Sequence, residues 1–274
     1  ENGAGKSTMI KILAGVKQPD EGTIEVKGEA VEIPDPIASQ ALGISVIFQE
    51  LNLIPNLTVS DNIFVGRELR RSRFLIDDNQ SRKLTRELLS QTGLHINPNT
   101  RVEDLPLSQR QMVEVAKALS IHSSLIIMDE PTSSLTGQEV ERLFEIIKRL
   151  TGQGVAVIFV SHKLEEVFQI CDRIHVLRDG KDVGTKPASE LSHNEVIKMM
   201  VGRELGSLFV KEEAEITEPI LEVENISSHA GIENVSFSVR KGEILGFAGL
   251  VGAGRTEVMR AVFGVDERTA GTIR

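Results

Sequence analysis

Short apolar runs alternate with stretches of helical periodicity along most of this chain. Residues 44–48 and 125–128 have the composition of strands, and residues 155–160 form an apolar, β-branched run typical of a central parallel strand. Residues 81–91 and 109–120 carry apolar side chains at the spacing of a helix face. Strands that alternate with helices predict an α/β fold, with a mostly parallel sheet flanked by helices.

Capping and turn residues indicate where further elements begin. Thr136 with Glu139 three residues on is a capping box, which predicts a helix that continues to about Leu150. Ser192 with Glu195 repeats this pattern and predicts another, shorter helix. The other expected features are a strand at residues 23–26, a hairpin turn at Asp179-Gly180, a helix end near Gly202 and a strand from about Ile220.

The two ends of the chain carry the same glycine-rich motif. GAGKST at residues 3–8 recurs as GAGRTE at residues 252–257, and the match continues without gaps beyond both motifs. The simplest interpretation is two copies of one domain, at residues 1–206 and 220–274, joined by an acidic, aperiodic linker at residues 207–219. We expect both copies to be truncated, because the chain begins inside one motif and stops just after the other.

Composition narrows the class of protein. The net charge is −9 and the pI is about 5.3, which disfavours a nucleic-acid partner because such a partner needs clustered positive charge. Cys171 is the single cysteine, so it is expected to be a small buried apolar side chain rather than a nucleophile, in a reducing cytosol. The longest apolar run, residues 155–160, is much shorter than the ~20 residues of a membrane span. Any membrane association is therefore expected to go through a partner.

The first glycine-rich motif matches the end of the phosphate-binding pattern G-x-x-x-x-G-K-[ST]. Glycines let the backbone wrap around phosphates, and the N–H groups of the loop and the next helix supply positive potential. Lys6 is expected to reach the β- and γ-phosphates of ATP, and Ser7 to ligate Mg²⁺. A chance glycine-rich turn is the alternative, and the helical pattern after the loop disfavours it. The residues expected to hold the nucleotide are Asn2, Gly3, Ala4, Gly5, Lys6, Ser7 and Thr8.

Polar residues follow the two strands expected at the centre of the sheet. The strand at residues 125–128 ends in Asp129 and Glu130. In P-loop NTPases the first carboxylate holds Mg²⁺, and Glu130 is placed to polarise the attacking water. Asp-Glu can also simply close a strand, an alternative that the upstream loop disfavours. His162 follows the strand at residues 155–160, where open α/β sheets bind ligands, although a lone histidine there is more often only solvated.

Taken in order, the motifs resemble those of the ABC ATPase family across the whole chain. The sequence contains GAGKST, Gln49 in VIFQE, the degenerate signature LPLSQRQ, LIIMDEP, SSLT and VSH. Residues 50–68 and 111–119 look like the tandem ATPases of ribose, galactose, xylose and arabinose importers. The resemblance implies a P-loop NTPase fold with a helical subdomain, at about residues 50–120, that carries the signature motif.

The resemblance also implies roles for the matching residues and the partners of the protein. Glu130 is implied as the catalytic carboxylate, His162 as the γ-phosphate switch, and Gln49 as a contact to both Mg²⁺ and the γ-phosphate. The implied metal ligands are Ser7, Gln49 and Asp129. The implied partners are membrane permease subunits, which would contact residues 51–67, and through them a sugar-binding protein. The chain itself is implied to lie at the cytoplasmic face of the bacterial inner membrane. Residues 51–67 can otherwise be a loop with core-facing Leu and Ile.

The signature departs from the family pattern Leu-Ser-Gly-Gly-Gln. Pro106 removes a backbone N–H donor, and Leu107 puts a side chain where the backbone should approach phosphate. Ser108 and Gln109 can still donate hydrogen bonds to a nucleotide.

The second glycine-rich loop is also altered. Gly252, Gly254 and the hydroxyl of Thr256 are kept, but Arg255 replaces the lysine and is bulkier. In the family, two domains pair around ATP, and each site joins one domain's P-loop to the other's signature. Both defects would therefore fall in one site. We hypothesise one hydrolytic site, built on the first loop, and one site that hydrolyses poorly.

Two other classes of protein are open at this point. A soluble tandem ABC protein acting on ribosomes is the first, although such proteins have a long charged linker and an intact signature. A non-hydrolysing regulatory ATP-binding module is the second. The complete set of motif residues argues against this class for the first copy, but it stays open for the second copy.

Overall fold

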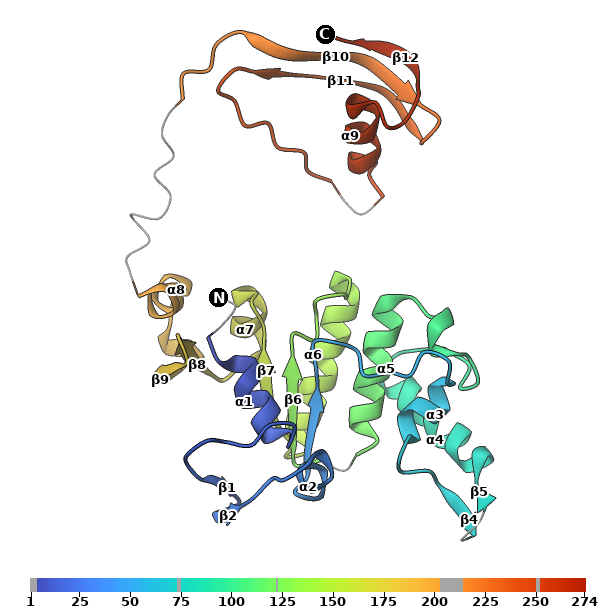
Figure 1. Ribbon diagram of the computed structural model, residues 1–274, viewed down its shortest axis with the longest axis vertical. Coiled ribbons are helices and arrows are strands. Elements are labelled where there is room, and N and C mark those ends of the chain that lie inside the picture. The colour runs from blue at the N-terminus through green and yellow to red at the C-terminus, as the bar shows by residue number, and fades with distance from the viewer. Residues whose placement is uncertain (1–3, 73–74, 122, 203–213, 250–251) are drawn as a thin grey trace. The chain divides into compact units, whose positions relative to one another are not determined.

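The computed structural model describes residues 4–72, 75–121, 123–202, 214–249 and 252–274. The chain divides into two compact units, Glu1–Leu205 and Gly206–Arg274, each with its own sheets and its own core (Figure 1). Of the linker predicted at residues 207–219, residues 207–213 lie outside the described residues.

A three-stranded parallel sheet lies at the centre of the first unit. Its strands are β3 (Ile44–Ile47), β6 (Leu125–Asp129) and β7 (Ala156–Val160), with β6 in the middle. Ile127 pairs with Val46 on one side and with Ile158 on the other. The apolar runs therefore form the parallel strands that their composition predicted, because strands covered on both faces need apolar side chains throughout.

Helices cover both faces of this sheet (Figure 1). Ile127 belongs to a cluster that contains Ile10 of α1 (Lys6–Leu13), whereas its neighbours along the strand belong to a different cluster. That second cluster includes side chains of α5 (Leu107–Leu119) and α6 (Gly137–Gly152). Because successive side chains of a strand point to opposite faces, α1 covers one face and α5 and α6 cover the other.

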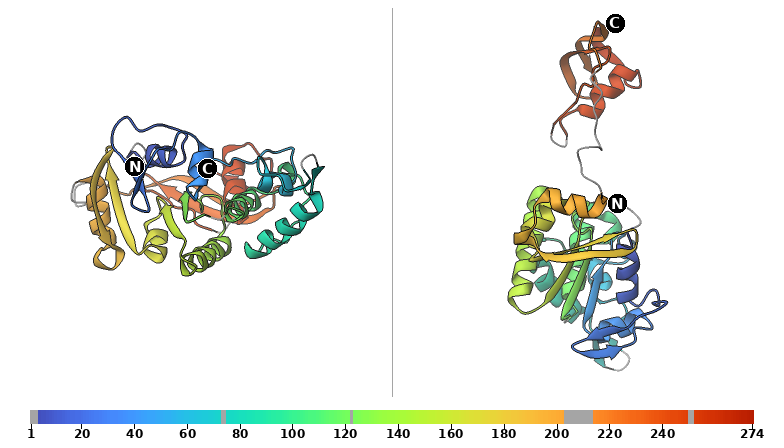
Figure 2. Two further views of the ribbon diagram at one scale, coloured as in Figure 1. Left: turned by 90° about the horizontal axis from the view of Figure 1, so that it is seen from below. Right: turned by 90° about the vertical axis from the view of Figure 1, so that its left-hand side faces the viewer.

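Two helices pack against α5 to form a helical subdomain (Figure 2), and Val113 and Ala116 of α5 belong to its core. The helices are α3 (Val59–Phe64) and α4 (Asp78–Gln91). The buried Asn62 accepts a hydrogen bond from the N–H of Ile54 at 2.7 Å and donates to its carbonyl oxygen at 3.0 Å, which holds the preceding loop against α3. The remaining elements are the 3₁₀ turn η1 (Val102–Asp104) and the hairpin of β4 (Arg70–Ser72) and β5 (Leu75–Ile76).

Two helices begin earlier than the apolar periodicity predicted. α4 starts at Asp78 rather than at residue 81, because the carboxylate of Asp77 accepts the N–H of Gln80 at 2.9 Å and so caps the helix. α5 starts at Leu107 rather than at residue 109, with Pro106 at the N-cap position. A proline costs nothing there, since no N–H of that residue is needed for the helix.

The hairpin predicted at Asp179-Gly180 is confirmed. It joins β8 (Arg173–Arg178) to β9 (Lys181–Pro187) with Arg178 opposite Lys181. Asp179 and Gly180 have φ values of 52° and 75°, as a type I′ turn requires of both central residues. A second hairpin, of β1 (Ile24–Val26) and β2 (Glu29–Val31), precedes the helix α2 (Pro36–Ala41).

The two capping boxes are also confirmed. The carboxylate of Glu139 accepts from the N–H and hydroxyl of Thr136, both at 2.8 Å, at the start of α6. The corresponding box at Ser192 opens α8 (His193–Val201), which ends at Gly202 with φ 74°. The helix α7 (Leu164–Ile170) and the 3₁₀ turn η2 (Ala188–Glu190) complete this part of the unit.

In the described part of the second unit, a helix packs on an antiparallel sheet. The strand order is β11 (Ile232–Arg240), β10 (Pro219–Ser228) and β12 (Arg268–Ile273). α9 (Arg255–Phe263) places Val258 and Ala261 in the core of this unit. The strand expected from about Ile220 is therefore present as β10.

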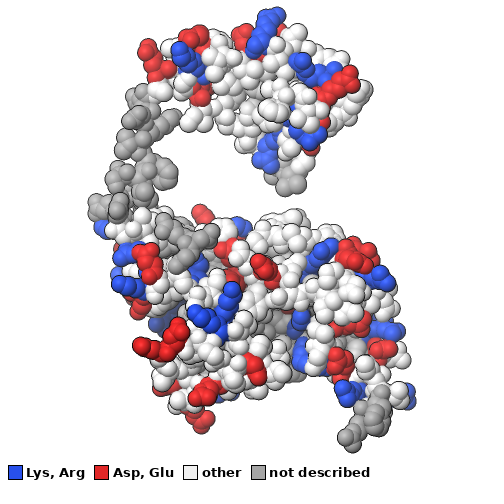
Figure 3. Space-filling view, viewed as in Figure 1, with Lys and Arg blue, Asp and Glu red and all other residues white. Residues whose placement is uncertain are grey.

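The surface carries both signs of charge, and acidic and basic side chains are interspersed on the face of the first unit seen in Figure 3. Within the described part of the chain, no helix is both long enough and apolar enough to cross a bilayer.

Phe144 tests the core between α6 and the sheet. It is 1% exposed, and its ring packs edge-on against Phe159 of β7 with centroids 5.9 Å apart. We expect Phe144→Ala to lower the free energy of unfolding by about 3–5 kcal/mol, because it removes an aromatic ring from a packed interior. Urea denaturation measures this. The adjacent exposed Glu145→Ala is the control and should change it by less than about 0.5 kcal/mol; equal effects would show that Phe144 is not a core residue.

Candidate functional site

A glycine-capped helix forms the first glycine-rich loop. α1 begins at Lys6, and its N-cap Gly5 has φ 95°, a conformation that side chains with a Cβ rarely adopt. Ile10 is buried in the core beneath the sheet and anchors the helix. The exposed Ser7 follows Lys6 in the first turn, where N–H groups have no partners within the helix. Asn2 and Gly3 of the predicted site lie outside the described residues, whereas Ala4 and Thr8 are described.

Asp129 ends the central strand as a buried carboxylate. It is 7% exposed, and burial, together with the charge of Glu130, raises its pKa above the usual aspartate value. Lys6 and Lys11 of α1 act in the opposite direction and lower this pKa. A positive charge within range favours the ionised form of a carboxylate. The charges of Lys6 and Lys11 on α1 therefore act on Asp129, which ends β6 at the carboxyl edge of the sheet.

Three polar side chains meet just beyond the ends of the three parallel strands. Oε2 of Glu130 accepts a hydrogen bond from Nε2 of Gln49 at 3.3 Å and lies 3.1 Å from Nδ1 of His162. The three residues follow β6, β3 and β7, whose carboxyl ends lie side by side in a parallel sheet. The structure thus brings together the three residues that the sequence indicated as catalytic.

Glu130 has an unusual backbone conformation. Its φ is 48°, in the left-handed region that non-glycine residues seldom occupy. Its N–H donates to the carbonyl oxygen of Val160 at 2.8 Å, so the pairing of β6 with β7 continues one residue past the strand. Strained residues of this kind gather at functional sites, where the surrounding structure holds them.

The residues predicted to ligate Mg²⁺ carry oxygen donors that suit this ion. A hydroxyl (Ser7), a carboxylate (Asp129) and an amide (Gln49) are the hard ligands that this ion prefers, and proteins commonly bind it through one or two carboxylates plus substrate phosphates. Among the described residues, no group of three or more His, Cys, Asp or Glu side chains could enclose a metal alone. The raised pKa of Asp129, caused by burial and by Glu130, also fits a place where a cation would be favourable.

The signature residues lie on a different element, at the N-terminus of α5. Leu107 is 58% exposed, and Ser108 and Gln109 are half-buried. Burial raises the pKa of Glu139, but hydrogen bonds from Thr136 and from Ser108 outweigh this effect, so the pKa lies below the usual glutamate value. The Ser108 hydroxyl is therefore directed toward α6 of its own unit.

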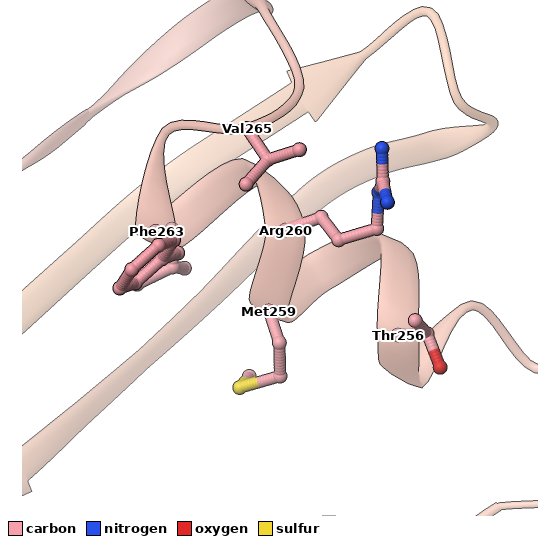
Figure 4. Close-up of a pocket in the computed structure, with 6 residues that line it drawn as sticks. Thr256, Met259, Arg260, Phe263 and Val265 are labelled. Carbon is pink, nitrogen blue, oxygen red and sulfur yellow. The ribbon is translucent and has the colours of Figure 1, made fainter.

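The second loop repeats the local geometry of the first. α9 begins at Arg255, and its N-cap Gly254 has φ 80°. Gly252 and Gly254 line a hollow together with Glu257. Thr256 borders a separate, mostly apolar hollow on the outer side of α9 (Figure 4). The other residues that line it are Met259, Arg260, Val262, Phe263 and Val265.

One buried carboxylate near the site is not indicated by the sequence motifs. Glu166 of α7 accepts hydrogen bonds from Thr132 and Ser161, which lie in the loops after β6 and β7. Its position four residues after His162 is the only signal in the sequence, and it does not distinguish Glu166 from the adjacent Glu165.

Known proteins match this chain in sequence and in structure. Residues 1–133 match the family model described as ABC transporter. The whole chain is 48% identical to a ribose import ATP-binding protein of Rubrobacter xylanophilus, covering 55% of it. It is 48% identical to a putative ribose/galactose/methyl galactoside import ATP-binding protein of Agrobacterium fabrum, covering 54% of it. The chain thus spans about half the length of these curated relatives.

A solved structure shares the fold of much of this chain. It is the dimeric ATP-binding cassette MJ0796 in a post-hydrolysis state, bound to ADP and Pi. The TM-score is 0.60 and the identity is 26%, over 69% of this chain and 82% of that one. A crystal structure of the ADP conformation of the cassette MJ1267, at 22% identity and a TM-score of 0.61, agrees with this fold.

We expect the thiol of Cys171 to be unreactive in the folded protein. Burial, with a smaller effect of the Asp172 charge, raises its pKa to about 11. Only the thiolate reacts, so we expect iodoacetamide to alkylate the folded protein at pH 8 at least ~100-fold more slowly than the urea-unfolded chain. Mass spectrometry of timed samples measures both rates. Similar rates in the two states would contradict the prediction.

Proposed function

From the match of residues 1–133 to the ABC transporter family, we propose that the protein binds and hydrolyses ATP to energise sugar import through a membrane permease. The observation that carries the proposal is the convergence of Gln49 and His162 on one oxygen of Glu130, next to an Asp129 whose pKa the charge of Lys6 lowers. The names of the curated relatives, which are import ATP-binding proteins, support the sugar as cargo.

Phosphate binding rests on the first loop. The N–H groups at the start of α1 point toward the space in front of the helix and add to its positive potential, which favours an anion. Lys6 supplies a point charge for the β- and γ-phosphates, and its side chain is half-buried and so partly oriented by its surroundings. Ser7, Asp129 and Gln49 are the residues that would hold Mg²⁺, which when bound neutralises developing charge on the phosphate oxygens.

Hydrolysis would depend on Glu130 and its two partners. Glu130 acts as the carboxylate that orients the attacking water and accepts its proton, and it is only 17% exposed. His162 and Gln49 can each donate a hydrogen bond to the γ-phosphate once they leave Glu130. Catalysis here is chiefly positioning and electrostatic stabilisation, because the transferred phosphoryl group requires little covalent chemistry from the protein.

The two ATP sites of the whole protein would be unequal. The first loop carries Lys6, whereas the second carries Arg255, whose forked guanidinium is bulkier than an ammonium group and need not fit the same cradle. The altered signature places Pro106 and the exposed Leu107 at the start of α5. If two domains pair around ATP, these changes meet in one site, and the site on Lys6 hydrolyses while the other mainly binds.

The partners follow from the same proposal. The permease subunits would contact the loop around Ile54 and the end of α3 near Val65, both of which expose apolar side chains. A sugar-binding protein would act through the permease. The protein would then lie at the cytoplasmic face of the bacterial inner membrane, as a peripheral subunit.

The first test removes the charge of Glu130. In the full-length protein, we expect Glu130→Gln to bind ATP with near-normal affinity and to hydrolyse it at least ~10²-fold more slowly, because the amide keeps the shape but cannot accept the proton of water. Nucleotide titration and phosphate release measure the two quantities. Glu145→Gln, at an exposed position on α6, should leave both unchanged. Near-normal turnover of Glu130→Gln would remove Glu130 from this role.

The second test compares the two loops. We expect Lys6→Ala to abolish most hydrolysis by the full-length protein and Arg255→Ala to reduce it only a few-fold, a loss about 10-fold smaller than that of Lys6→Ala, because only the first loop serves the hydrolytic site. Steady-state phosphate release with saturating ATP measures both variants. Equal losses would contradict the unequal-site proposal and leave ATP binding itself untouched.

A further inference from the structure

Glu166 is a buried charged group close to the proposed catalytic residues but not among them. Its residue is 8% exposed, and its side chain comes from the first turn of α7. A buried carboxylate is costly unless hydrogen bonds or charges compensate for it. The contacts of Glu166 therefore show how this cost is offset.

Each oxygen of Glu166 has defined partners. Oε2 accepts hydrogen bonds from the hydroxyl of Thr132 at 2.6 Å and from the hydroxyl of Ser161 at 2.9 Å. Oε1 lies 2.9 Å from Nζ of Lys163. Burial raises the pKa of Glu166, but these three partners lower it more, so the group is ionised at neutral pH.

The two hydroxyls belong to the two loops that carry the proposed catalytic pair. Thr132 is two residues after Glu130, in the loop that follows β6, and it is 2% exposed. Ser161 directly precedes His162, in the loop that follows β7, and its oxygen also accepts the N–H of Lys163 at 3.1 Å. One carboxylate oxygen thus joins the two loops at positions within two residues of Glu130 and His162.

His162 needs such an anchor because its own side chain is not held by packing. That side chain is 62% exposed, and its nitrogen lies 3.1 Å from Glu130 across the gap between the two loops. An exposed ring can keep this distance only if the backbone on both sides is fixed. Small displacements of catalytic groups are expensive, since an error of about 1 Å can cost roughly 10²-fold in rate.

We propose that Glu166 is a positioning residue that clamps the loop carrying Glu130 to the loop carrying His162. The inference rests on the proposed ATPase function, and it adds a residue that the motifs do not include. A carboxylate suits this place better than an amide, because both of its oxygens accept, one from the two hydroxyls and one from Lys163, whereas glutamine has a single acceptor oxygen and can serve only one of these sides.

The main experiment uses Glu166→Ala in the full-length protein with Glu165→Ala as the matched control. Glu165 is the adjacent glutamate in the same helical turn, but it is exposed. We expect Glu166→Ala to lower kcat for ATP hydrolysis roughly 10- to 100-fold, with the nucleotide dissociation constant changed by less than about threefold. The phosphate-binding loop is not part of the clamp, so binding should persist. Glu165→Ala should match the wild type in both measurements.

A double-mutant cycle separates positioning from general stability. If Glu166 acts through the His162 loop, Glu166→Ala should cause less than about a twofold further loss in a His162→Ala background. A residue that only supports the fold would cause the same fold-loss in both backgrounds, and that result would overturn the proposal. Should Glu166→Ala fail to fold, Thr132→Val and Ser161→Ala each remove one hydroxyl donor and are subject to the same cycle.

Hydrogen exchange provides a readout that does not need hydrolysis. In the nucleotide-free protein, the amides of residues 130–134 and 161–163 should exchange faster in Glu166→Ala and at wild-type rates in Glu165→Ala. If the wild type did not hydrolyse ATP, the proposed function would fail while this measurement still tested the clamp. Unchanged exchange in Glu166→Ala, or faster exchange with an unaltered kcat, would overturn the positioning role.

Discussion

The first unit depends on the parallel pairing of β6 with both β3 and β7. This pairing buries Ile126, Ile127 and Met128 on alternate faces, and each face then becomes a seat for helices. It also brings the carboxyl ends of three strands to one edge, because parallel strands end on the same side of a sheet. The same parallel pairing of the three strands therefore forms the core and brings the residues of the candidate site together.

That edge contains charges that a stable fold alone would not favour. Asp129 is buried next to Glu130, and two neighbouring carboxylates repel each other when both are ionised. Lys6 and Lys11 offset part of this cost from α1. Glu130 adds a left-handed backbone conformation. Local rules that are broken at one place, inside an otherwise consistent fold, are typical of a functional site.

The two glycine-rich loops show how far a motif determines its surroundings. Both are followed by a helix whose N-cap glycine has a positive φ, so the local geometry is the same. Ile10 of α1 is buried beneath the parallel sheet, whereas Met259, which takes the equivalent place in the repeat, is exposed on α9. A motif thus specifies a turn and a helix start, but burial depends on what else folds against that helix.

Local signals in the sequence determined much of this protein. Capping boxes at Thr136 and Ser192, the turn at Asp179 and the apolar composition of three strands each act within a few neighbouring residues, so they could be predicted correctly. The order of the motifs also indicated Gln49, Glu130 and His162. Only the tertiary structure decided that Gln49 and His162 both contact one oxygen of Glu130, and that Glu166 rather than Glu165 is buried between two loops. Such contacts join residues far apart in the chain, and their geometry follows from strand register and helix packing, which no local pattern specifies.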